Sequence, residues 1–284
     1  MSVFHSVSAF CNAGFDILGT AGQTFPSLTG YIANPLINLV IMLLIVIGGI
    51  GFLTWDDFCT NKWNLKRYRL QSKIILVTTA VLILLPAIFF FLSDFAGFSM
   101  GKRILASFFQ SVTLRTAGFN TADLGAMNDS SKAIMTLMML IGGSPGSTAG
   151  GMKTTTIAVL ILNAFATFGR EPETEVFGRR FDNTVVKNAA TIAILYFFLF
   201  FAGGIAISQI EHIALSDCLF ETASAVGTAG LTLGITTELG LVSHLILVVL
   251  MYLGRVGGLT LIYAAISVKI QSGAKRPLDK ITVG

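Results

Sequence analysis

One short segment occurs three times in this chain, at spacings of about a hundred residues. The copies are FHSVSAFCNAGFD (4–16), FQSVTLRTAGFN (109–120) and FETASAVGTAGLT (220–232). Each runs from a helix-like stretch into a triad that ends in glycine, at Gly14, Gly118 and Gly230. The repeating unit is far larger than that of a solenoid. The sequence therefore predicts one polar loop that is built at several equivalent places in the fold.

The composition favours a membrane protein. Of the 284 residues, 54% are hydrophobic and only 12% are charged, which is not typical of a soluble domain. Charge-free runs occur at 36–53, 74–92, 188–210 and 241–254. The first three have roughly the twenty residues that cross a bilayer, and the last continues past Arg255 to Val268. We therefore expect an all-α integral membrane protein.

The basic residues predict the orientation, because cytoplasmic loops collect lysine and arginine. Most lie in segments that we place on one side: Lys62, Lys66, Arg67, Arg69, Lys73, Arg170, Arg179, Arg180, Lys187, Lys269, Lys275, Arg276 and Lys280. The opposite side has Lys102, Arg103, Arg115 and Lys132. This imbalance predicts a multi-pass protein of the cell membrane, with a cytoplasmic C-terminus and the triads near the outer face. The net charge of +4 needs no nucleic-acid partner to explain it.

A complete unit is predicted to contain a span, a short re-entrant helix, the triad and a second span. A partial repeat at 1–60 has only the re-entrant helix, the loop and the second span. A full repeat with a broken second span follows at 61–175, and a full repeat with a short cytoplasmic tail at 176–284. About ten re-entrant residues make about 15 Å of helix, against a bilayer core of about 30 Å. These segments can only dip into the membrane and return.

The triads are the candidate ion filter. Non-helical backbone at membrane depth is tolerated only where it is buried in protein or lines water, and glycine permits backbone conformations that a Cβ would forbid. Rings of carbonyl oxygens can replace the hydration shell of a cation, and the first residue of each triad can add a side-chain oxygen or hold the loop. Tight interhelical turns of small residues are the alternative. The candidate residues are Asn12, Ala13, Gly14, Thr116, Ala117, Gly118, Thr228, Ala229 and Gly230.

The stretch GGSPGSTAGGMKTTT at 142–156 is the candidate gate. As one helix with its apolar flanks, 133–141 and 157–168, it would extend about 54 Å, so a span broken midway by glycines and a proline is predicted. A surface loop between two shallow helices is the alternative. A phosphate-binding loop is rejected because Met152 intervenes before the lysine. The candidate residues are Gly142, Gly143, Pro145, Gly146, Gly150, Gly151 and Lys153.

Further charged residues are predicted at membrane depth. Arg255 lies more than a turn inside the last span, where a lone guanidinium is costly, so it either joins the gate or extends to the cytoplasmic edge. Arg115 either anchors the back of the filter or is solvated at its mouth. Asp217 and Glu221 are expected to cap a helix N-terminus rather than bind ions. The histidines and cysteines lack the spacing of a metal site, and we find no nucleophile and base for an intramembrane enzyme.

The triads, with TAGFN at 116–120 and GTAGLTLG at 227–234, resemble the filter loops of the Trk/Ktr/HKT superfamily of potassium transporters. The resemblance is to KtrB-like membrane subunits and covers the whole chain. It implies four units arranged like a tetrameric potassium channel, each giving one filter glycine. This chain would contain about two and a half of them, with Gly14, Gly118 and Gly230 as the second to fourth filter glycines. It also implies that 142–156 is a gating loop and that Arg255 lies beneath the filter.

The resemblance further implies K⁺ bound by filter carbonyls only, a homodimer, and a separate cytoplasmic nucleotide-binding regulatory subunit of the RCK type. No cofactor is then expected in this chain. Sodium is an alternative cargo, because a serine at the first filter position accompanies sodium transport in the family. That position is expected in an N-terminal part of about 140 residues that the repeat period places before Met1. A nonconducting fragment or scaffold is the other alternative.

Overall fold

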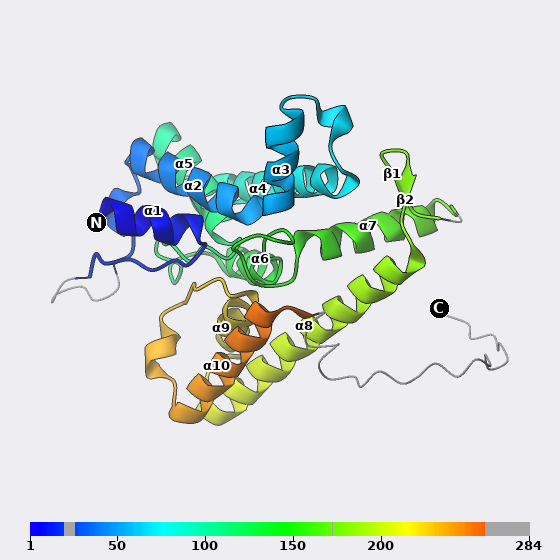
Figure 1. Cartoon of the computed structure of the whole chain (residues 1–284). Coiled ribbons are helices and arrows are strands. Elements are labelled where there is room, and N and C mark those ends of the chain that lie inside the picture. Colours follow the sequence, from blue (N-terminus) through cyan, green and yellow to red (C-terminus); the bar gives the residue numbers. More distant parts are fainter. Residues whose placement is uncertain (20–25, 172, 259–284) are drawn as a thin grey trace.

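A computed structural model describes residues 1–19, 26–171 and 173–258 (Figure 1). Its α-helices are α1 (Ser2–Phe10), α2 (Pro35–Ile50), α3 (Phe52–Asn61), α4 (Leu70–Leu92), α5 (Met100–Thr113), α6 (Asp129–Leu140), α7 (Thr154–Phe168), α8 (Asn183–Glu211), α9 (Leu215–Gly227) and α10 (Leu241–Val256). Short 3₁₀ turns are η1 (Thr29–Tyr31), η2 (Leu65–Arg67) and η3 (Ile235–Glu238), and β1 (Glu175–Val176) pairs with β2 (Arg179–Arg180) in a small antiparallel hairpin. The predicted all-α class is confirmed, and the predicted continuation of the last span to Val268 lies outside the described residues.

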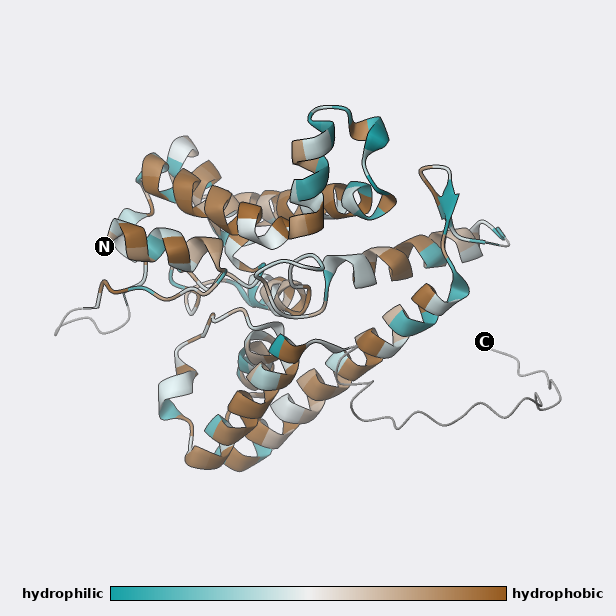
Figure 2. Ribbon diagram, in the orientation of Figure 1, coloured by the Kyte–Doolittle hydropathy of each residue, from teal (hydrophilic) through white to brown (hydrophobic). Residues whose placement is uncertain are grey.

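Two helices, α4 and α8, are long and apolar enough to cross a bilayer. With 23 and 29 residues, they extend about 35 and 44 Å. Helix α8 begins where the Asp182 carboxylate accepts a hydrogen bond from the Thr184 backbone N–H at 3.0 Å, and this N-cap fixes its first turn. Both helices have exposed apolar residues along their length, and their ribbons are coloured largely as hydrophobic in Figure 2, as expected of helices that face lipid.

The helix in the region of the predicted span 36–53 is shorter than expected. Helix α2 ends at Ile50, and the chain turns by 96° into α3. Gly51 makes this turn with a φ of +95°, a conformation that glycine adopts readily. A Cβ at Gly51 would also lie 2.6 Å from the Pro145 carbonyl oxygen. The end of α2 is therefore shaped by the loop that packs against it.

Three short helices, α1, α5 and α9, precede the triads. They contain 9, 14 and 13 residues, or about 14, 21 and 20 Å, which is too short to cross a bilayer. Helix α1 packs on α2, α5 on α4, and α9 on both α8 and α10. Each short helix is thus held by the longer helices next to it in sequence, and α1 runs from the N-terminus toward the middle of the molecule (Figure 1).

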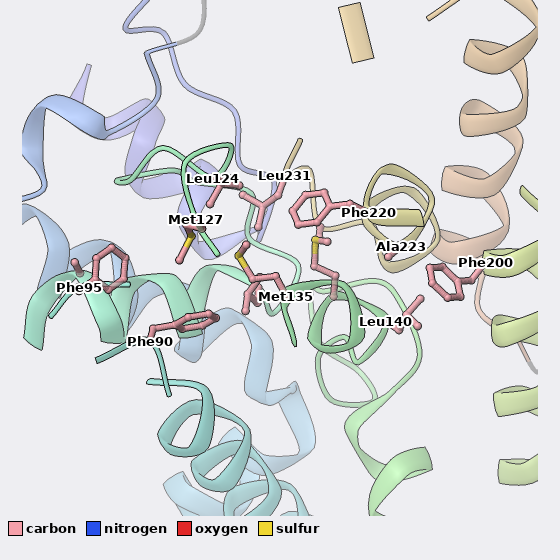
Figure 3. Close-up of a cluster of buried hydrophobic side chains, with 14 residues drawn as sticks. Phe90, Phe95, Leu124, Met127, Met135, Leu140, Phe200, Phe220, Ala223 and Leu231 are labelled. Atoms are coloured by element: carbon pink, nitrogen blue, oxygen red, sulfur yellow. The ribbon is translucent and has the colours of Figure 1, made fainter. Parts of the chain in front are cut away.

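A buried apolar cluster joins the second and third repeats (Figure 3). Phe90 of α4 and Met135 of α6 lie on one side of it, and Phe220 of α9 and Phe200 of α8 on the other. All four side chains are buried. Because this core fixes α6 against α9, it also fixes the chain that follows α6 relative to the third triad.

The basic segments before α4 and before α8 lie near each other. The Lys73 ammonium of α4 lies 5.9 Å from the centre of the Phe177 ring at the tip of the hairpin, a cation–π geometry. Arg69 forms an ion pair with Asp56 at 2.7 Å, which ties the start of α4 to α3. These contacts place two of the predicted cytoplasmic segments on one side of the molecule.

Candidate functional site

The three triads meet at one place. A Cβ at Gly118 would lie 3.3 Å from the Cα of Gly14 and 3.5 Å from the Cα of Gly230. Gly118 therefore lies between the other two glycines, although each is more than a hundred residues away in sequence. All nine candidate filter residues belong to these three loops, so the fold brings them together.

The triads also share one backbone conformation. The first and third residues of each have positive φ, whereas the alanine between them does not: Asn12 (50°), Gly14 (70°), Thr116 (59°), Gly118 (80°), Thr228 (54°) and Gly230 (79°). When residues of positive and negative φ alternate, successive N–H groups point to one side of the chain and the carbonyl groups to the other. Three loops of the same shape at one place can therefore present several carbonyl oxygens to a common axis.

Glycine is required at the third position of the first two triads for its lack of a side chain. A Cβ at Gly118 would lie 2.7 Å from the Ala229 carbonyl oxygen, and one at Gly14 would lie 2.9 Å from the Cα of Gly118. Both contacts involve backbone, which cannot rotate out of the way. The close approach of the loops thus depends on these glycines.

Hydroxyl groups on the short helices hold the chain after the triads. Ser8 Oγ donates to the Phe15 carbonyl oxygen at 2.8 Å, and Thr113 Oγ1 donates to the Phe119 carbonyl oxygen at 2.6 Å. Both hydroxyl residues lie four positions after the phenylalanine that opens each repeated segment, as Ser224 does in the third. These hydroxyl residues were not predicted from the sequence, although each of the three copies has a hydroxyl side chain at this position.

The backbone supplies a matching contact in every copy. The triad alanine donates its N–H to the carbonyl oxygen of that same hydroxyl residue, as in Ala13 to Ser8 at 2.9 Å and Ala229 to Ser224 at 2.8 Å. The corresponding bond of Ala117 is 3.1 Å long. Each triad is therefore fixed to the C-terminal turn of its own short helix.

The sequence suggested that Glu221 caps a helix N-terminus, but the structure shows another role for this residue. It lies in the second turn of α9 and is only 4% exposed. Its carboxylate accepts hydrogen bonds from Thr232 Oγ1 (2.5 Å), Thr236 Oγ1 (2.7 Å) and the Leu233 backbone N–H (3.1 Å). The side chain points toward the loop after Gly230, which sequence position alone cannot reveal. Asp217 does lie in the first turn of α9.

Replacing Glu221 with leucine is expected to destabilise the protein by about 3 kcal/mol, because three donors lose a buried charged acceptor. Thermal unfolding in detergent measures the change, and Glu238→Leu in the exposed turn η3 is a matched control. An unchanged midpoint for Glu221→Leu would contradict this role.

Arg115 is buried, with 6% of its surface exposed, so the expectation of a solvated side chain at the mouth is wrong. Within the described residues its Nε and Nη2 atoms have no hydrogen-bond partner. Its carbonyl oxygen accepts a hydrogen bond from Asn12 Nδ2 at 3.2 Å. Arg115 therefore forms a hydrogen bond with the first triad through its backbone carbonyl.

The candidate gate is a loop between α6 and α7, closed on itself. The Gly142 N–H donates to the Met152 carbonyl oxygen at 2.8 Å, and the Thr154 N–H donates to the Gly143 carbonyl oxygen at 3.0 Å. Gly142, Gly143, Gly150 and Gly151 are buried, which does not fit the alternative of a surface loop. Gly146 at the turn is exposed.

This loop lies directly against the triads. A Cβ at Gly150 would lie 3.1 Å from the Cβ of Thr228, and one at Gly151 would lie 2.9 Å from the Gly227 carbonyl oxygen. Thr148 Oγ1 lies 3.0 Å from Asn12 Oδ1. The loop thus touches the first residues of two triads, at the ends of the triads where the short helices finish.

The loop is also wedged between α2 and α10. On the α2 side, the Ser144 N–H donates to the Gly49 carbonyl oxygen at 3.0 Å, and the Phe52 N–H donates to the Gly146 carbonyl oxygen at 3.0 Å. On the α10 side, the Gly151 N–H lies 3.3 Å from the Gly254 carbonyl oxygen. The bend after α2 and the end of α10 therefore form the walls of the loop site.

Two cationic side chains bind adjacent carbonyls of this loop. Lys153 Nζ donates to the Ala149 carbonyl oxygen, and Arg255 Nη1 donates to the Thr148 carbonyl oxygen, both at 2.7 Å. Neither side chain has a carboxylate within ion-pair distance among the described residues. The gate candidates Lys153 and Arg255, remote in sequence, therefore place two positive charges beside one loop.

The whole of residues 1–274 matches a family model described as "TrkH: Cation transport protein". The chain belongs to this TrkH family. The predicted relationship to the Trk and Ktr proteins is thereby confirmed, and the family is one of transport proteins rather than enzymes.

Relatives in the family include potassium uptake proteins. The chain is 35% identical to the potassium/sodium uptake protein NtpJ of Enterococcus hirae and 33% identical to the Ktr system potassium uptake protein B of Bacillus subtilis. Each alignment covers 100% of this chain, and 64% and 63% of the respective relatives. This member of the family thus spans less than two thirds of the length of these proteins.

The fold agrees with that of a solved structure. The potassium transporter TrkH from Vibrio parahaemolyticus superposes with a TM-score of 0.75 at 21% sequence identity. The match covers 93% of this chain and 58% of that protein. It supports the helical architecture described above for the TrkH family member.

Proposed function

We propose that this chain is the membrane subunit of a potassium uptake system and that ions pass along the three triads. The observation that carries the proposal is the meeting of Gly14, Gly118 and Gly230 in loops of one backbone shape. The names of the two relatives, which both include potassium uptake, support the choice of ion.

In this account, triad carbonyls replace water around a dehydrated ion. Helices α1, α5 and α9 each end no more than two residues before a triad, so the negative ends of three helix dipoles face the ion path. The hydroxyl groups of Thr116 and Thr228 are buried and have no hydrogen-bond partner among the described residues. They are available as further oxygen ligands at the inner end of the filter.

The loop at 142–153 would close the path beneath the filter. Its contacts with the triads leave no separation between loop and filter at Thr228, and the charges of Lys153 and Arg255 oppose the passage of a cation. Opening would require the loop to leave its site between α2 and α10. The hydrogen bonds of the loop to both helices are then the interactions that opening must break.

The assembly is proposed to be a homodimer in the cell membrane, regulated by a cytoplasmic nucleotide-binding subunit of the RCK type. Its C-terminus would be cytoplasmic and its filter loops near the outer face. The excess of Lys and Arg around Lys73 and Arg180 supports this orientation, and so does the contact between Lys73 and Phe177, which joins the two basic segments.

Sodium is a second candidate cargo. The name of the Enterococcus hirae relative includes both potassium and sodium. Carbonyl filters distinguish the two ions through the number and arrangement of oxygen ligands, so competition by sodium against potassium uptake separates the two candidates.

The transporter is expected to restore growth of potassium-uptake-deficient cells on low potassium when expressed as the cell assembles it. Membrane insertion is verified by surface labelling of the same cells. Correct insertion without growth would contradict the proposal. Uptake of tracer sodium without uptake of potassium in the same cells would favour the second candidate.

A further inference from the structure

Every polar atom of Thr148 contacts a different part of the site. Its N–H lies 3.3 Å from the Gly48 carbonyl oxygen of α2, and its carbonyl oxygen accepts from Arg255 of α10 at 2.7 Å. Its hydroxyl lies 3.0 Å from both the Phe10 carbonyl oxygen and Asn12 Oδ1. Since a hydroxyl has one proton to donate, both acceptors share it.

Asn12 joins this gate residue to two triads. It is the first residue of the first triad and is 7% exposed. Its Oδ1 accepts from Thr148, while its Nδ2 donates to the Arg115 carbonyl oxygen at 3.2 Å. Arg115 directly precedes Thr116, the first residue of the second triad. One side-chain amide thus connects the loop to the first and second triads.

The other triads lack this connection. Thr116 and Thr228 occupy the position of Asn12, with the same left-handed backbone, but their hydroxyls have no hydrogen-bond partner among the described residues. Asparagine differs in two respects: it tolerates positive φ better than a β-branched residue, and its longer amide has both a donor and an acceptor. The first triad is therefore the one whose leading side chain forms a hydrogen bond with the loop.

We propose that the Thr148–Asn12 hydrogen bond couples the gate to the filter, so that the first two triads help to hold the loop closed. The inference rests on the proposed transport function. With the loop in place, Asn12 is held from both ends and the first and second triads are fixed in register. When the loop leaves, Oδ1 loses its donor and the amide holds only the second triad.

Thr148→Val removes the hydroxyl with little change in volume. It is expected to raise potassium flux about three- to tenfold, because the closed loop loses one hydrogen bond. The ratio of potassium to sodium uptake is expected to stay near the wild-type value, because the bond is absent once the loop has left its site. Thr167→Val is the matched control, since that hydroxyl bonds only the Asn163 carbonyl oxygen within α7.

Asn12→Thr breaks the same contact from the filter side, by introducing the residue that the other two triads have. The inference therefore does not depend on the folding of one variant. We expect Asn12→Thr to raise the flux as Thr148→Val does, and the double variant to raise it no further than the larger single effect. A wild-type flux in Thr148→Ser, which keeps the hydroxyl, would support the role of the bond.

Potassium and sodium uptake are measured for the wild type and all variants at matched surface expression. An unchanged flux in Thr148→Val would overturn the coupling, and so would single increases in flux that multiply in the double variant. Either result, with an active wild type, leaves the proposed transport function intact. An inserted wild type that takes up no potassium would overturn both.

Discussion

Gly118→Ala is expected to reduce potassium uptake by more than about tenfold. A φ of +80° costs a residue with a Cβ about 1–2 kcal/mol, and the added carbon would lie 2.7 Å from the Ala229 carbonyl oxygen. Relief of that contact requires the second and third triads to move apart. Because a carbonyl filter depends on the spacing of its oxygens, selectivity should fall together with flux. Tracer uptake at matched surface expression measures both.

Gly101→Ala provides the matched control for this variant. Gly101 lies in α5, the helix that leads to the same triad, and a Cβ there would meet nothing within 4 Å. Alanine is also the better helix former, so uptake should stay near the wild-type value. If Gly118→Ala transported potassium as well as Gly101→Ala, the second triad would not be part of the filter.

Arg255→Met is expected to raise potassium flux on the order of tenfold. The change removes a charge-assisted hydrogen bond to the Thr148 carbonyl oxygen, an interaction of about 1.5–3 kcal/mol. It also removes one of two positive charges beside the loop. Both effects favour the open state, because the bond stabilises the closed loop and the charge opposes cation entry. Initial rates of tracer uptake provide the measurement.

Two further variants test how specific this effect is. Lys153→Met should raise the flux in the same direction, since Lys153 binds the neighbouring Ala149 carbonyl oxygen. Arg170→Met removes an exposed cation beyond the end of α7 and should leave the flux unchanged. A flux that stays constant or falls in Arg255→Met would count against the loop as a gate.

The membrane spans were predictable because their signal is local. Helices α4 and α8 consist mainly of charge-free runs of sufficient length, so no tertiary information is needed to identify them. The loop between α6 and α7 was equally visible, since glycines and a proline interrupt an apolar pattern. The bend after α2 was not predictable in this way. The run 36–53 has no charge, and the turn at Gly51 depends on its contact with the loop around Pro145, which is remote in sequence.

The candidate site was predicted as a set of residues but not as a network. The repetition of the triads identified Gly118 and its equivalents, because each copy requires the same backbone conformation at this position. The roles of Glu221 and Thr148 depend on where side chains point after folding. Glu221 was wrongly assigned as a helix cap because sequence position indicates which turn a residue occupies, not which loop it faces.

The most direct test of the central claim is tracer flux of potassium and sodium into proteoliposomes that contain the purified transporter as the cell assembles it. The account predicts potassium flux that depends on the three triads, with Gly118→Ala much slower and Arg255→Met faster than the wild type. Equal potassium flux in the wild type and in Gly118→Ala would contradict it.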